Sequence, residues 1–511
     1  MPQSMVESQG CNGGTTSPTV HRSPFTVHRA QGRSGRYHPT MKRRSNPSKP
    51  LLVTSILALV LAMVAPWSTI ASGQAAPPPP EPGLLPVPEP LPAAAPGTLI
   101  DSVEFPSGDF GFDVEAHQIL FHSTDRHGAD IAVSGIVLVP TGIPAPAGGR
   151  GVAAWGHGTT GLHDRCAPSL EAQEGWRLNN PGSYERVDDL LAAGHVVVAS
   201  DYPGLGTPGV HPYLDGEGEG RSVLDSVRAA REFGGTGPVV IQGFSQGSQA
   251  ALFAGQLASE YAPEIDLRAV VAIGTPSLFG EAFAAMDIPV VQGYITKVLG
   301  GILATYPELP RDQILTPSGE AAWDDYVAKA DDLYYHCFDP QFWVPNDVKA
   351  DPMTVPAWRD AILALYPGKS PIDVPVLMVQ STDDEQALAM LADGVCRDLQ
   401  ANGSDVRMWR YDGPGHVASV HESATDRMQW INDRLAGRPF TDDVDFEGDL
   451  VPRVLTTCPA EGEAPPPPVG AGATPGTPAT PVLPTSPGGP ATPGVPAAPA
   501  TPMGGTANYT G

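Results

Sequence analysis

A serine flanked by two glycines, Ser245, stands where a short apolar run meets a helical segment. Residues 243–247 form the pattern G-x-S-x-G directly after the run at 238–242. In a nucleophile elbow, the glycines permit a tight strand-to-helix turn that lifts the serine hydroxyl clear of the sheet. The N-terminus of the following helix also favours negative charge nearby. Ser245 is therefore the candidate nucleophile.

A serine nucleophile needs a general base, and the base needs an acid that orients it. On a sheet that carries such an elbow, the chain order is serine, acid, histidine, and the acid and the histidine each follow a strand. Asp384 follows the apolar run at 375–380, and His416 follows the run at 406–411. We therefore expect Ser245, Asp384 and His416 to form a catalytic triad.

Neighbouring residues leave alternatives for the acid and the base. Asp383 precedes Asp384 and is the alternative acid, although we expect it to be a turn residue; Asp201, after the run at 195–200, is a third choice. His421 lies five residues after His416 and is expected to begin a helix.

The tetrahedral intermediate of acyl transfer requires two backbone donors for its oxyanion. One is expected to be the N–H of Gln246, the residue after the nucleophile. The other is expected in the Gly-rich loop at 156–161, from Gly158 or Thr159.

The same loop raises a metal-site alternative. Its three candidate ligands are His157, His163 and Asp164. We disfavour a metal because the loop already has a role and no second ligand set accompanies it. No cofactor is expected.

Short apolar runs alternate with segments of helical spacing through the centre of the chain. A turn at 125–128 joins alternating segments at 116–123 and 131–140, which predicts a hairpin. The continuous apolar runs, typical of parallel strands buried on both faces, lie at 151–155, 195–200, 238–242, 268–274, 375–380 and 406–411. Helices are predicted at 185–193, 221–233, 246–259, 386–400 and 423–435. The order predicts the α/β class: a mostly parallel sheet with helices on both faces.

About 100 residues separate the runs at 268–274 and 375–380, and this interval predicts a helical cap at about 275–370. Six of its apolar residues recur at helical spacing, namely Ile295, Val298, Leu299, Ile302, Leu303 and Tyr306. Their shared face could line an acyl pocket, meet a lipid surface, or form the core of the cap itself.

Glycine and proline divide the chain into parts. Of its 511 residues, 57 are Gly and 58 are Pro, and the prolines concentrate at 1–96 and 459–511. This distribution predicts an N-terminal extension with a signal peptide at 1–75, a Pro-rich linker at 76–96, one globular domain at 97–458 and a Pro-rich tail at 459–511.

The two ends predict export. An uncharged apolar run at 51–65 follows four basic residues and precedes a small-residue stretch, which is typical of a secretory signal peptide; a membrane anchor would need about 20 apolar residues. In the tail, Pro occupies every third position from Pro475 to Pro502, so a polyproline II helix would align these prolines along one edge. This tail is either a spacer that contacts a cell wall or a disordered segment without a role.

Charge and cysteines restrict the partners and the compartment. The net charge of −26 opposes nucleic-acid binding and adhesion to anionic lipid. Loss of the first 75 residues would remove Cys11 and leave four cysteines, Cys166, Cys337, Cys396 and Cys458. In an exported protein these predict two disulfides, with three possible connectivities.

Residues 97–440 resemble the secretory lipase family, the lipase-A-like α/β-hydrolases. The motifs that carry the resemblance are the elbow, Gly158-Thr159-Thr160-Gly161, Cys166-Ala167-Pro168-Ser169 and Asp201-Tyr202-Pro203-Gly204-Leu205-Gly206. The resemblance implies an α/β-hydrolase fold with a helical cap, the triad named above, and an oxyanion hole at Gly158 and Gln246. It also implies a disulfide from Cys166 to Cys337, which leaves Cys396 to pair with Cys458.

One departure from the family concerns the residues after the elbow. Ser248 and Gln249 follow Gly247, where relatives often have a second glycine. A bulkier residue there could alter packing under the nucleophile without removing a catalytic group.

We therefore expect an exported serine hydrolase that cleaves carboxylic esters of lipids, with possible action at a lipid–water interface. A short-chain esterase, an acyltransferase or a peptidase could use the same triad. A non-catalytic protein bound to the cell wall is the alternative from another class, and the complete serine, acid and histidine order opposes it.

Overall fold

The computed structural model describes residues 83–108, 110–174, 187–277, 289–328, 337, 347–413, 415–439, 446 and 450–460. The expected signal peptide, residues 76–82 of the expected linker and the Pro repeat of the tail lie outside these ranges. The hypotheses about export and cell-wall contact therefore stay predictions. None of the helices in these ranges combines the length and the apolar character that a membrane span requires.

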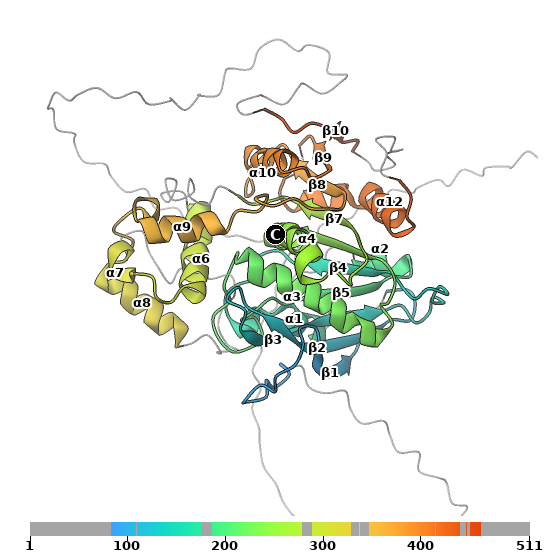
Figure 1. Cartoon of the computed structure of the whole chain (residues 1–511), viewed down its shortest axis with the longest axis horizontal. Coiled ribbons are helices and arrows are strands. Elements are labelled where there is room, and N and C mark those ends of the chain that lie inside the picture. The colour runs from blue at the N-terminus through green and yellow to red at the C-terminus, as the bar shows by residue number, and fades with distance from the viewer. Residues whose placement is uncertain are drawn as a thin grey trace, which may run out of the picture. The chain divides into compact units, whose positions relative to one another are not determined.

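A ten-stranded sheet in the order β1-β2-β3-β5-β4-β6-β7-β8-β9-β10 forms the centre of the fold (Figure 1). Its strands are β1 (Leu99–Phe105), β2 (Glu115–Thr124), β3 (Asp130–Val139), β4 (Val152–Gly156), β5 (Val196–Ser200), β6 (Val239–Phe244), β7 (Leu267–Ile273), β8 (Val376–Ser381), β9 (Val406–Tyr411) and β10 (Arg453–Leu455). Neighbouring strands in the series β5-β4-β6-β7-β8-β9 pair in parallel. The pairs β1–β2, β2–β3, β3–β5 and β9–β10 are antiparallel. All predicted strands are confirmed; β1 and β10 are additions at the two edges.

Helices cover both faces of the sheet, as the continuous apolar runs predicted. Buried side chains of α3 (Gly216–Ala229), α4 (Gln246–Tyr261) and α10 (Ala389–Ala401) pack on one face. Those of α2 (Val187–Ala192) and α12 (Ala424–Leu435) pack on the other. Alternate residues of the central strands divide between the two cores, so the parallel strands are covered on both sides.

Helix α3 begins five residues before the predicted start at 221. Its first turns contain Gly216, Gly218 and Gly220, which resemble a loop in sequence. A Cβ on Gly220 would lie 2.8 Å from the backbone nitrogen of Ala254, so glycine permits close packing of α3 on α4. This packing offsets the low helix propensity of glycine.

The predicted cap is a group of helices, α6 (Pro289–Thr305), α7 (Arg311–Ile314), α8 (Pro317–Val327) and α9 (Pro356–Ala364) (Figure 1). Five of the six apolar residues noted at helical spacing are buried in one cluster with Trp323 and Trp358, and Tyr306 packs against it. Tyr213 and Leu214, from the segment after β5, complete this cluster. These residues form the core of the cap rather than an acyl pocket or a lipid-facing surface.

Part of the predicted linker packs against the domain. Gln173, at the end of α1 (Pro168–Gln173), bonds both the backbone N–H and the carbonyl of Gly83, at 3.2 and 3.1 Å. Leu84 packs beside Cys166, and the buried Leu85 contacts a cluster on β2 and β3. Proline supplied the expectation of an extended spacer, but the leucines between the prolines bind this segment to the domain.

Two disulfides join distant parts of the chain. Cys166 pairs with Cys337, 171 residues away, and Cys396 of α10 pairs with Cys458. Of the three connectivities that the sequence allowed, this is the one that the family resemblance implied.

Candidate active site

Ser245 occupies a strained turn between β6 and α4. Its φ of 55° and ψ of −120° are unusual for a residue with a side chain. Its backbone N–H donates to the carbonyl of Ile273 on the neighbouring strand at 2.8 Å. A Cβ on Gly243 would overlap the carbonyl of Gly247, and a Cβ on Gly247 would overlap that of Gly156. The two glycines of the motif are therefore required for the turn to close.

The structure brings the three predicted triad residues together. Nε2 of His416 lies 2.9 Å from Oγ of Ser245, and Nδ1 lies 2.8 Å from Oδ2 of Asp384. The imidazole is buried and packs against Phe244, with ring centroids 4.7 Å apart. Its tautomer follows from these contacts: a neutral ring donates from Nδ1 to the carboxylate and accepts at Nε2.

The carboxylate of Asp384 is fixed by donors from its own loop. Oδ1 accepts from the backbone N–H groups of Gln386 and Ala387, at 3.0 and 2.7 Å, and Oδ2 accepts from the amide of Gln380 at 3.0 Å. The cap reaches this loop, because the hydroxyl of Tyr294 on α6 donates to the side chain of Gln386 at 2.6 Å.

The alternatives to Asp384 and His416 lie elsewhere. Asp383 is exposed, and His421 is an exposed residue in the last turn of α11 (Ala418–Glu422) rather than at a helix start. Asp201 is buried, and its carboxylate accepts from Ser134 Oγ at 2.7 Å and from the N–H of Ser169 at 2.8 Å. Burial raises the pKa of Asp201 to about 6. Asp201 therefore connects β3, β5 and α1, and holds no histidine of the triad.

The two candidate arms of the oxyanion hole pack against each other. Gln246 is the first residue of α4, and a Cβ on Gly156 would lie 2.8 Å from the carbonyl of Gly247 in the same helical turn. Gly158 lies against the ring of Phe244, with 3.3 Å between its ideal Cβ and Cδ1. The loop after β4 thus lies beside the elbow, as an oxyanion hole requires.

The residues that depart from the family pattern are accommodated. Ser248 donates to the carbonyl of Ser245 at 2.7 Å. The amide of Gln249 donates to the carbonyls of Leu214 and Leu365, at 3.0 and 2.6 Å. Gln249 therefore joins the helix behind the nucleophile to the end of the cap helix α9.

His157 makes contacts that differ from those of a metal ligand. Its Nδ1 lies 2.7 Å from the carbonyl of Gly158, its Nε2 lies 3.2 Å from that of Asp201, and its ring stacks on Tyr202. Burial lowers the pKa of His157 to about 4, so the ring is neutral. In the described ranges, no cluster of three or more His, Cys, Asp or Glu could hold a metal ion.

Sequence reasoning missed two polar residues under the elbow. Glu219 of α3 and His211 are both buried, and each contacts the side chain of Gln246. Glu219 lies two residues before the predicted start of the helix at 221, and no motif marks His211. One signal in the sequence could have placed Glu219 on the helix. The helical spacing that begins at 221 continues back to 219 if glycines are accepted inside a helix.

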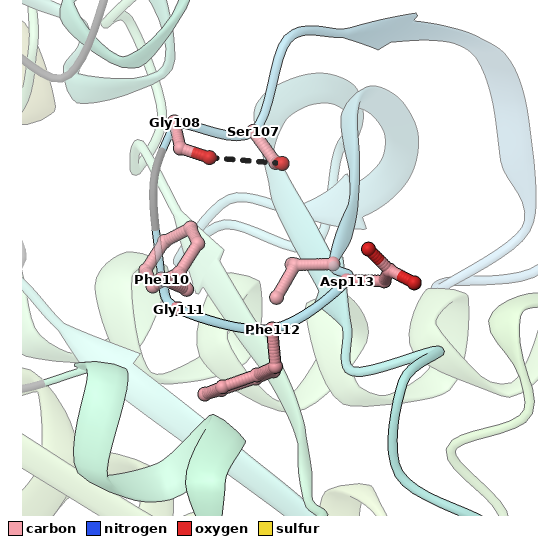
Figure 2. A pocket seen from close by; sticks show the side chains of 7 residues that line it. Ser107, Gly108, Phe110, Gly111, Phe112 and Asp113 are labelled. Carbon is pink, nitrogen blue, oxygen red and sulfur yellow. Dashed lines mark hydrogen bonds between the residues drawn. The ribbon is translucent and has the colours of Figure 1, made fainter.

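A surface pocket is formed by residues other than those of the triad and the oxyanion loop. Seven residues of the loop between β1 and β2 line it, namely Ser107, Gly108, Phe110, Gly111, Phe112, Asp113 and Val114 (Figure 2). The triad residues come instead from the loops after β6, β8 and β9.

A mostly parallel sheet covered on both faces, with a serine on the turn after β6, defines an α/β-hydrolase. Residues 184–330 match the model of the secretory lipase family. The resemblance of the chain to that family is thereby confirmed; the matched residues include Ser245 but neither Asp384 nor His416.

The chain is similar in sequence to proteins that are named lipases. The chain is 26% identical over 375 residues to a probable inactive lipase of Mycobacterium tuberculosis, covering 68% of this chain and 80% of the relative. It is 28% identical over 297 residues to a secreted triacylglycerol lipase of Malassezia furfur, covering 54% and 76%. The comparisons thus indicate a hydrolase of the lipase and esterase kind.

Solved structures share the fold. Candida antarctica lipase A in its closed state superposes with a TM-score of 0.57 at 19% identity, covering 68% of this chain and 84% of that one. A ligand-bound form of the rice cell wall degrading esterase LipA of Xanthomonas oryzae gives a TM-score of 0.54 at 19% identity, covering 67% and 99%.

Proposed function

We propose that this protein is an exported serine hydrolase that cleaves carboxylic esters of lipids. The observation that carries the proposal is the hydrogen-bonded chain from Ser245 through His416 to Asp384, with links of 2.9 and 2.8 Å. One relative is a probable inactive lipase. In this chain the serine, the imidazole and the carboxylate are all present and within bonding distance.

The proposed mechanism follows from the contacts of each group. Oγ of Ser245 attacks the ester carbonyl while Nε2 of His416 accepts its proton. The carboxylate of Asp384 holds Nδ1–H and stabilises the imidazolium. The imidazolium then gives its proton to the leaving alcohol, and the acyl group remains on Ser245.

The oxyanion that forms in this step accepts from the backbone N–H groups of Gln246 and Gly158. Water, deprotonated by His416, attacks the acyl-enzyme and releases the acid. The sequence of proton transfers thus runs twice, and neither half requires a metal or a cofactor.

Export and an ester substrate presented at a lipid–water interface are parts of the same proposal. The apolar run at 51–65 and the secreted relatives support export. The lipase relatives support a lipid ester. The Pro repeat at 475–502 supports contact with a cell wall.

The test compares the full secreted protein with its Ser245→Ala variant on p-nitrophenyl esters of increasing acyl length, a triglyceride emulsion and a peptide amide. Ser107→Ala, in the loop between β1 and β2, is the matched control. We expect ester turnover that Ser245→Ala abolishes and Ser107→Ala retains.

The substrate profile separates the competing functions. Turnover limited to short esters supports an esterase, and amide cleavage supports a peptidase. Complete inactivity on every substrate supports the non-catalytic alternative and contradicts the proposal.

A further inference from the structure

A buried polar link joins α3 to the first residue of α4. The side-chain nitrogen Nε2 of Gln246 lies 2.8 Å from Oε1 of Glu219 and 2.8 Å from Nε2 of His211. All three side chains are fully buried. Polar groups at such depth are costly unless they are paired, so this contact fixes the conformations of the groups involved.

The hydrogen positions in this link follow from the acceptors around it. Nδ1 of His211 lies 2.7 Å from the carbonyl of Pro203 and therefore carries the proton. Its Nε2 is then an acceptor. Burial lowers the pKa of His211 to about 3, which agrees with a neutral ring. The two amide hydrogens of Gln246 are thus divided between His211 and Glu219, and a flipped amide would place its oxygen against two acceptors.

The same carboxyl oxygen of Glu219 also holds the other arm of the site. Oε1 accepts from the backbone N–H of Leu214 at 2.9 Å, where the chain takes a positive φ of 63°. The preceding residue, Tyr213, has its hydroxyl 2.7 Å from Oγ1 of Thr159 in the loop after β4. One buried oxygen is therefore bonded directly to Gln246, and it is linked to the loop that carries Gly158 through Leu214 and Tyr213.

We propose that Glu219 is a positioning residue that holds the two arms of the oxyanion hole in register, through Gln246 on one side and Leu214 and Tyr213 on the other. This inference rests on the proposed function, because it assigns Glu219 a part in the same ester hydrolysis. Glu219 touches no reacting atom and acts through the backbone of its neighbours.

The charge of Glu219 fits this position. Burial raises the pKa of the Glu219 carboxyl well above its usual range, which favours the neutral form of the group. A carboxylate at this place would oppose the negative charge that develops beside Gln246. A neutral carboxyl keeps the acceptor oxygen without that repulsion.

The test measures Glu219→Ala, Glu219→Gln and Glu217→Ala in the full secreted protein. Glu217 is the matched control because it lies two residues away on α3, is partly exposed and pairs with Arg126. Each variant is titrated for active sites, and kcat, KM and the affinity for an alkyl boronic acid are measured. The boronate forms a tetrahedral adduct with the serine, so its affinity depends on the oxyanion hole.

We expect Glu219→Ala to lower kcat per titrated site by about 10- to 100-fold with little change in KM, because complete loss of an oxyanion donor costs about 10²- to 10³-fold and a displaced donor costs less. Boronate affinity should fall by a similar factor. Glu219→Gln retains an acceptor oxygen and should restore most of kcat, while Glu217→Ala should match the wild type. Unchanged kcat per titrated site and unchanged boronate affinity in Glu219→Ala would mean a structural role alone and would overturn the proposal.

Gln246→Ala removes the same link from the other end and keeps the test decisive if Glu219→Ala fails to fold. We expect the double variant to lose no more activity than the more impaired single variant, because both changes break one contact. Multiplicative losses would contradict the proposal. Activity that survives Ser245→Ala would refute the proposed function itself, whereas an inert Ser245→Ala beside a normal Glu219→Ala refutes only this inference.

Discussion

Gly274, at the end of β7, lies directly against the imidazole of His416. A Cβ at this position would lie 3.0 Å from Cε1 and 3.1 Å from Nδ1 of the ring, and the backbone φ is +59°. The absence of a side chain at 274 therefore leaves the space that the imidazole occupies between Ser245 and Asp384.

Gly274→Ala should displace this ring. We expect kcat to fall by about 10- to 100-fold, since displacements near 1 Å in a catalytic group cost on that order. Gly234→Ala is the matched control, because Gly234 has a φ of +84° and no atom within 4 Å of its ideal Cβ. Both variants place alanine at a positive φ, so both have the same kind of backbone strain. Equal activity in the two variants would show that the contact between residue 274 and His416 has no effect on catalysis.

Asp384→Asn should lower kcat by about 10³- to 10⁴-fold, because an amide can stabilise the wrong histidine tautomer. Asp383→Asn, one residue away and exposed, should retain activity. Steady-state kinetics on one ester measures both. A large loss of kcat in Asp383→Asn with normal activity in Asp384→Asn would assign the catalytic acid to Asp383.

Asp201→Asn should change how stability depends on pH. Burial raises the pKa of Asp201 to about 6, from about 4 in an unfolded chain. Between these values the folded state holds a proton that the unfolded state has released, so stability falls as the pH rises. A shift of this size corresponds to about 3 kcal/mol.

Urea unfolding from pH 4 to pH 7 measures this effect. The free energy of unfolding of the wild type, minus that of Asp201→Asn, should fall by about 2 kcal/mol between pH 4 and pH 6, because the full amount is reached only outside the two pKa values. Asp101→Asn, an exposed control, should show little such change. A difference that rises with pH would contradict the account of Asp201.

Removal of the disulfide between Cys396 and Cys458 should destabilise the domain. The bond spans 62 residues, and closing a loop of that size stabilises a fold by about 4 kcal/mol in the chain-entropy treatment. Cys396→Ser, Cys458→Ser and the double variant should lose the same free energy of unfolding, because all three lack one bond. Additive losses in the double variant would show that the two cysteines are unpaired in the folded protein.

The parallel strands and the triad could be predicted because local signals determine them. A buried parallel strand is apolar throughout, and the elbow needs glycine at 243 and 247 for steric reasons that any sequence must obey. Asp384 and His416 follow from chain order once the strands are placed. The strand and elbow signals each lie within about ten residues, and chain order then selects Asp384 and His416 from the loops after the strands.

The contacts that could not be predicted join distant residues. Glu219 meets Gln246 because glycines let α3 approach α4, and the predicted helix began only at 221, after Glu219. Leu85 binds the Pro-rich segment to the sheet through a contact that no local pattern shows. For the apolar residues of α6, helical spacing predicted which face is buried. Only the structure shows that the other cap helices bury this face.

The most direct test of the account is covalent labelling with a p-nitrophenyl alkylphosphonate, followed by intact mass measurement and peptide mapping. The account predicts one p-nitrophenol released per active site, one phosphonyl adduct on Ser245, and loss of labelling in both Ser245→Ala and His416→Ala. An adduct on another residue, or labelling that persists in Ser245→Ala, would contradict it.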